Sequence, residues 1–170
     1  MDELVRWLGE QLDEDERIAR AAIEAAGDVP GAANWRFGNA YTDADEEVTY
    51  WQITTMTPKV DGFGPVELVG SGMSGGGAHE PEIAQHAVEH DPARVLQEID
   101  AKRRVLARHH AAPIPPGNEW IALYPYCAAH AYEWPEGSVV YPVELKGCPE
   151  LRDLAAAYSH RPGYREEWRP

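Results

Sequence analysis

The stretch HDPARVLQEIDAKRRVLARHH, residues 90–110, constrains the fold more than any other part of the sequence. Asp91 is a good N-cap residue, and Pro92 suits the first position of a helix, where its missing N–H costs nothing. Four apolar residues recur at helical spacing and share one face: Val95, Leu96, Ile99 and Leu106. The stretch therefore predicts a central helix that ends on two adjacent histidines, His109 and His110, before a proline-rich break.

The residues before this helix predict further elements. Leucines recur every four residues near the start of the chain, so we expect a first helix over about residues 2–26. Residues 34–72 are rich in β-branched and aromatic residues separated by turn formers, which predicts a small antiparallel sheet with a hairpin loop at 42–47. A short helix is expected over residues 80–89.

The residues after the central helix predict extended segments around a tight knuckle, followed by a last helix that starts near Pro149. The expected fold class is α+β, with the chain forming a single domain over residues 1–170. In this prediction, residues 1–112 form the helix, sheet and central-helix body. Residues 113–170 form the knuckle and the C-terminal helix, which pack on the body.

Charge and hydropathy exclude some classes of function. The formal net charge is −14, which disfavours generic nucleic-acid binding. No apolar run approaches the roughly 20 residues that a membrane span needs, and the acidic start of the chain is unlike a secretory signal. We therefore expect a cytoplasmic protein without a membrane contact, whose partner is another protein or a second copy of the chain.

The cysteines and histidines near the C-terminus predict a zinc site. Cys127 and His130 are separated by two residues, as ligand pairs on zinc knuckles commonly are, and Cys148 stands where the start of the last helix would favour its thiolate. The fourth ligand would be His109 or His110. Such a closed site would be structural. The alternative is two reduced, partly buried cysteines beside surface histidines, and a disulfide is disfavoured in the cytoplasm.

A rival metal site lies earlier in the chain. The segment from His86 to His90 matches an inverted metalloprotease pattern, with Glu89 between the two histidines. In that chemistry the histidines hold zinc and the glutamate acts as a general base toward bound water. A further ligand would have to come from one of three later glutamates: Glu98, Glu144 or Glu150.

Three segments together carry a family resemblance: LVRWLGEQLDEDERIARAA, HDPARVLQEIDAKRRVL and LRDLAAAYSHRPGYREEW. The combination resembles an uncharacterised family of small actinobacterial and actinophage proteins, a domain of unknown function. A weaker similarity links GAANW and HDPARVL to short phage accessory proteins. The resemblance implies no reaction. It does imply a zinc knuckle, because members often carry extra cysteines before the final helix, where this chain has Cys127, His130 and Cys148.

These observations favour a non-enzymatic accessory or interaction protein that is stabilised by structural zinc. A second hypothesis is an acidic mimic of nucleic acid, which would occupy a DNA- or RNA-binding protein and would carry carboxylates in regular rows. A third is a small zinc hydrolase that uses His86, Glu89 and His90, with an open metal position in a cleft.

Overall fold

The computed structural model describes residues 3–27, 29–42, 49–56, 67–69, 81–112, 126–133, 135, 137, 139–140 and 143–170. The chain divides into two compact units, and each is described by itself. Unit 1 comprises Met1–Glu14 and Ile99–Pro170, and unit 2 comprises Asp15–Glu98. The single domain over residues 1–170 stays a prediction.

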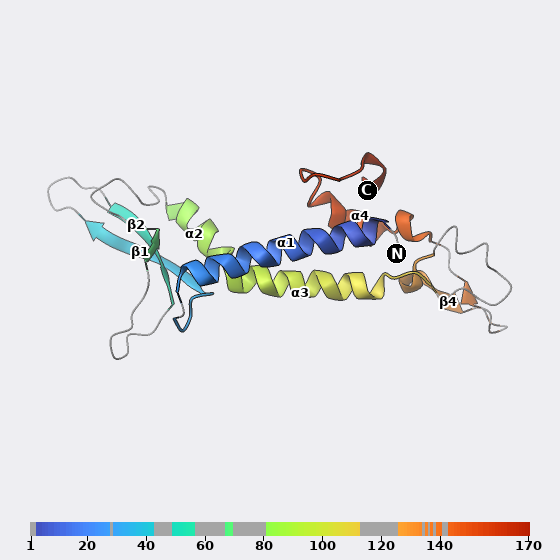
Figure 1. The fold of residues 1–170 in the computed structure, drawn as a ribbon, viewed down its shortest axis with the longest axis horizontal. Coiled ribbons are helices and arrows are strands. Elements are labelled where there is room, and N and C mark those ends of the chain that lie inside the picture. The colour runs from blue at the N-terminus through green and yellow to red at the C-terminus, as the bar shows by residue number, and fades with distance from the viewer. Residues whose placement is uncertain are drawn as a thin grey trace. The chain divides into compact units, whose positions relative to one another are not determined.

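The described elements confirm the α+β class (Figure 1). The helices are α1 (Glu3–Ala25), α2 (Pro81–Glu89), α3 (Pro92–Arg108) and α4 (Pro149–Ala156), with short 3-10 helices η2 (Ala128–His130), η3 (Leu145–Gly147) and η4 (Glu166–Trp168). The strands are β1 (Trp35–Thr42), β2 (Thr49–Thr55), β3 (Glu67–Val69), β4 (Tyr132–Glu133) and β5 (Val139–Val140). Among the described helices, none combines the length and apolar character that crossing a membrane requires.

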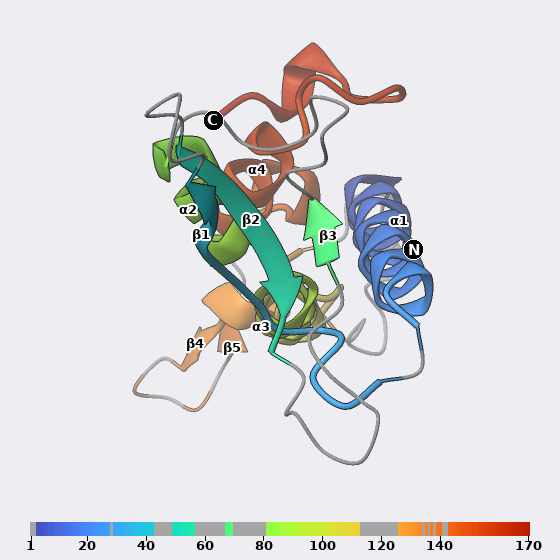
Figure 2. The same ribbon diagram turned by 90° about the vertical axis from the view of Figure 1, so that its left-hand side faces the viewer.

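Unit 2 contains the predicted antiparallel sheet. Strand β2 lies between β1 and β3 and is antiparallel to both (Figure 2). The pairing of β1 with β2 runs from Trp35 opposite Thr55 to Thr42 opposite Thr49. Helix α2 contacts both of these strands. The predicted hairpin loop at 42–47 falls almost entirely outside the described residues.

The start of α3 follows the capping prediction. The Asp91 carboxylate accepts a hydrogen bond from the backbone N–H of Arg94 at 2.8 Å, which is the contact of an N-cap residue. Its other oxygen accepts the backbone N–H of Trp35 at 3.2 Å. One carboxylate therefore both begins α3 and fixes the first residue of β1. Ile99, in the middle of the predicted stripe, is buried.

Unit 1 contains an aromatic cluster that joins the first turns of α1 to the C-terminal segment. The Trp7 side chain is buried, and its ring centroid lies 5.1 Å from that of Trp168, 5.9 Å from Tyr164 and 6.5 Å from Tyr158. The indole N–H of Trp7 donates to the carbonyl of Pro162 at 3.1 Å. Burial of several aromatic rings and a satisfied indole N–H make this cluster a main source of stability in the unit.

Gly163 passes close to this cluster, so we expect Gly163→Ala to destabilise the protein by about 2 kcal/mol. The φ angle of Gly163 is +84°, and a Cβ there would lie 2.9 Å from Trp7 Nε1. Gly9→Ala is the matched control, because Gly9 lies inside α1 with nothing within 4 Å of an added Cβ. It should stabilise by roughly 0.5–1 kcal/mol. Urea unfolding of both variants tests this, and equal midpoints would contradict it.

Candidate metal centre

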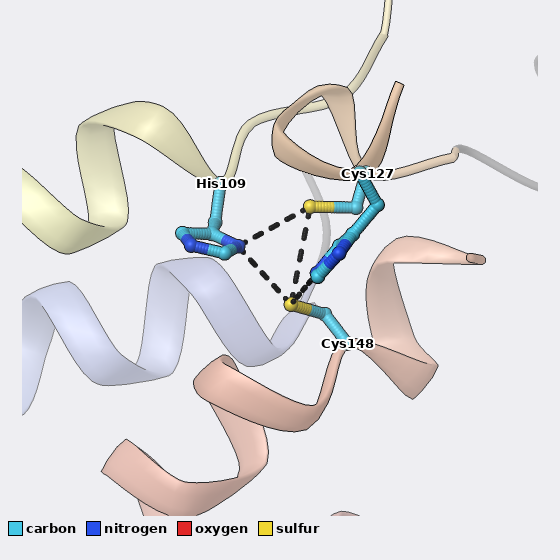
Figure 3. A group of neighbouring side chains, drawn as sticks. His109, Cys127 and Cys148 are labelled. Carbon is cyan, nitrogen blue, oxygen red and sulfur yellow. Dashed lines mark hydrogen bonds between the residues drawn. The ribbon is translucent and has the colours of Figure 1, made fainter. Parts of the chain in front are cut away.

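Four side chains from three separate segments of unit 1 converge on one point. His109 directly follows α3, Cys127 caps the N-terminus of η2, His130 is the last residue of η2, and Cys148 caps the N-terminus of α4. One ligand atom from each lies within 4.8 Å of all the others. Figure 3 shows His109, Cys127 and Cys148 pointing toward one another from the ends of their elements.

Two short antiparallel contacts bring these segments together. Ala111, just after α3, pairs with Cys127, and Tyr126 pairs with Glu144, just before η3 and α4. The segment at 126–127 therefore lies between the end of α3 and the approach to α4. Neither pairing leaves a pattern in the sequence, because each involves a single bridge and not a strand with alternating residues.

Four of the six separations between the ligand atoms resemble the edges of a coordination tetrahedron. The two sulfur atoms are 3.9 Å apart. His109 Nδ1 lies 3.2 Å from Cys148 Sγ and 3.4 Å from Cys127 Sγ, and His130 Nε2 lies 3.4 Å from Cys148 Sγ. Tetrahedral zinc, with bonds of about 2.3 Å to sulfur and about 2.05 Å to nitrogen, gives edges of about 3.8 Å between sulfurs and about 3.5 Å between sulfur and nitrogen. The arrangement is one that could hold a metal ion.

Three of the four candidate ligand side chains are buried. Both cysteines are 0% exposed and His109 is 6% exposed, whereas the His130 side chain is 23% exposed. Both cysteines are free thiols, and their sulfurs are much farther apart than the roughly 2.05 Å of a disulfide.

Burial sets the protonation of two ligands. Burial raises the pKa of the Cys148 thiol to about 12. The hydrogen bond from the backbone of Leu151 lowers this pKa. The backbone at the start of α4 does favour the Cys148 thiolate, but burial has the larger effect on the pKa. Burial also lowers the pKa of His109, with the charge of Glu150 opposing the shift. The imidazole is thus kept in the neutral form that binds metals, while the thiol must lose its proton on binding.

The sequence left open which of the two adjacent histidines belongs to the site, and the structure places His109 there. His110 is exposed, and its Nδ1 lies 3.1 Å from the carbonyl oxygen of Ala107. Residues one apart at the end of a helix point about 100° away from each other, so only one of the pair can face the cluster.

Glu150 is a fifth group at the centre; the sequence suggested it only as a possible ligand of the rival site and not beside these cysteines. Its Oε2 lies 3.0 Å from His130 Nε2 and 3.4 Å from Cys148 Sγ. The hydrogen bond from its own backbone N–H, in the first turn of α4, is the largest of the effects that lower the pKa of Glu150. The signal that could have indicated it is its position two residues after Cys148 at a helix start.

The rival pattern at residues 86–90 lies in unit 2. The rings of His86 and His90 are 4.4 Å apart between centroids, and His90 Nδ1 lies 2.9 Å from the carbonyl oxygen of His86. The Glu89 carboxylate forms an ion pair with Arg94 at 3.2 Å. Within the described part of the chain, one group of three or more potential ligands comes together, and none of these residues belongs to it.

Comparison with known proteins gives one match. The model of a family described as "Family of unknown function (DUF6221)" matches residues 1–170. No curated protein and no solved structure matches the chain.

Proposed function

Since the chain belongs to the DUF6221 family, whose function is unknown, we propose a function from the centre that its own residues build. The protein is a non-enzymatic accessory or interaction protein in which His109, Cys127, His130 and Cys148 hold one structural zinc ion. The zinc ties the end of α3, the η2 turn and the start of α4 into one unit.

The observation that carries the proposal is the set of four donor atoms within 4.8 Å of one another, four of whose six separations are close to those of tetrahedral zinc. Two thiolates and two imidazoles are ligands that zinc prefers, and a tetrahedral site of two sulfurs and two nitrogens is typical of zinc. The charges also balance, because a divalent cation neutralises two thiolates that would otherwise be buried as uncompensated charges.

The ligand count supports a structural and not a catalytic role. Catalytic zinc sites usually have three protein ligands and keep a fourth position for water or substrate. Here four protein side chains converge on the same point, and three of them are buried. The zinc would therefore stabilise a surface on which the protein meets its partner.

The partner is proposed to be a protein. A net charge of −14 favours a basic surface on it. A nucleic-acid mimic would need rows of free carboxylates, but at least four acids of α1 are already paired, including Glu3 with Arg165 and Glu10 with Arg6. Asp13 lies 2.6 Å from Arg103, and Glu16 lies 2.6 Å from Arg20. We therefore favour a general interaction role over mimicry.

Metal content tests the zinc proposal. Elemental mass spectrometry of the untagged protein should find one zinc per chain, which Cys127→Ser, Cys148→Ser and His109→Ala should lose. His110→Ala and His86→Ala are matched controls and should keep it, because neither residue belongs to the cluster. A wild-type protein without zinc would refute the proposal. Zinc lost in His86→Ala but kept in the cysteine variants would favour the hydrolase instead.

A further inference from the structure

The metal centre has one side that solvent reaches. Of the four ligands only His130 has appreciable exposure, at 23% of its side chain, and the neighbouring Glu150 side chain is 49% exposed. Resting on the proposed zinc site, we propose that Glu150 is the entry point for the metal. Its carboxylate binds the incoming zinc ion and transfers it to His130 and Cys148.

The route follows from burial. Cys127, Cys148 and His109 are covered by the protein, so a hydrated cation cannot meet them first. It can meet an exposed carboxylate, which is a common oxygen ligand of zinc. A negative charge at the mouth of a site also raises the local concentration of cations and their rate of association.

The transfer needs only a short movement of the metal. Glu150 Oε2 lies 3.0 Å from His130 Nε2 and 3.4 Å from Cys148 Sγ. These separations are close to the distances of roughly 3.3–3.5 Å between two ligands of one tetrahedral zinc ion. A zinc ion held by the carboxylate therefore already has two of its final ligands within its coordination distance.

The same contact explains why Glu150 would leave the metal afterwards. An ionised carboxylate only accepts hydrogen bonds, so its contact with His130 Nε2 requires a proton on that nitrogen. In the zinc-bound form that nitrogen offers its lone pair to the metal, so the neutral imidazole carries its one proton on Nδ1 instead. The carboxylate then loses its partner and, being half-exposed, can turn to water. Glu150 should therefore govern the rates of loading and release and not the final ligand set.

Stopped-flow exchange of zinc with a fluorescent chelator tests this role. Metal-free wild type and Glu150→Gln are each mixed with zinc, and the loaded proteins are then challenged with the chelator. In Glu150→Gln loading should slow on the order of tenfold, the lower range of electrostatic effects on association, and removal should slow because the carboxylate that receives the departing ion is absent. Asp153→Asn is the matched control. It removes one charge from the same helix, and Asp153 makes no hydrogen bond or ion pair with the four ligands among the described residues.

The expected signature is slower exchange in both directions with one zinc per chain and an unchanged dissociation constant. Rates in Glu150→Gln equal to those of wild type, or an equal slowing in Asp153→Asn, would overturn the entry role. A loss of zinc stoichiometry in Glu150→Gln would also overturn it, because Glu150 would then be an obligatory ligand. A wild type that binds no zinc would refute the proposed function itself, so the two failures are distinct.

Discussion

Removal of zinc is expected to lower the free energy of unfolding by about 4 kcal/mol when free zinc exceeds its dissociation constant about 1,000-fold. For a chain of this size the melting temperature should fall by roughly 10 °C. The reason is that the ligands come from three segments that, among the described residues, are joined near the site by single backbone bridges and a few hydrogen bonds. Without metal, two buried thiols are left with weak partners.

Hydrogen exchange measured by mass spectrometry can show which parts of the protein lose stability when zinc is removed. Amides in η2 and α4 should lose protection in the metal-free protein, because both elements carry ligands. Amides of β1 and β2 belong to unit 2, which holds none of the four ligands, and should keep their protection. An equal loss of protection in both units would contradict a local role for the metal.

Cys148→Ser provides the control for the stability measurement. This variant lacks a ligand, so its melting temperature should not respond to added zinc. If it is stabilised by zinc as much as wild type, the stabilising ion binds elsewhere in the chain.

The sequence predicted the parts of the fold that depend on interactions between residues close together in the chain. The start of α3 is determined by Asp91 and Pro92, and the structure has both the helix start and the side-chain cap. The sheet was predicted from β-branched and aromatic runs, and the described strands β1 and β2 lie within them. Local propensity and capping act over a few residues, so they can be read from one sequence.

The sequence indicated most of the residues that form the metal centre, but not how those residues are arranged in space. The spacing of Cys127 and His130 indicated a ligand pair, and the structure places both in the cluster with Cys148. The choice of His109 over His110 depends on the rotation of the last turn of α3 and on the bridge from Ala111 to Cys127. Such single bridges are tertiary contacts without a periodic pattern, and so is the approach of Glu150 to His130.

Trp7→Ala is expected to lower the free energy of unfolding by about 3–5 kcal/mol, the range found for large aromatic side chains removed from a core. Trp7 contacts three aromatic rings, and its indole N–H donates to a backbone carbonyl. The substitution leaves a cavity among those rings and deprives the Pro162 carbonyl of its donor. Chemical unfolding followed by far-UV circular dichroism measures the loss without depending on the fluorescence of the removed residue.

Trp35→Ala is the matched control, because Trp35 also donates its indole N–H to a backbone carbonyl, that of Ala32 at 3.1 Å, but is only half-buried. Its loss should cost less, since less apolar surface is returned to water. Equal destabilisation by the two variants would contradict the importance of the Trp7 cluster. Folded Trp7→Ala should still bind one zinc, because Trp7 is not among the four ligands. The aromatic cluster and the metal centre would then be separate sources of stability within unit 1, so combining Trp7→Ala with zinc removal should give nearly additive losses.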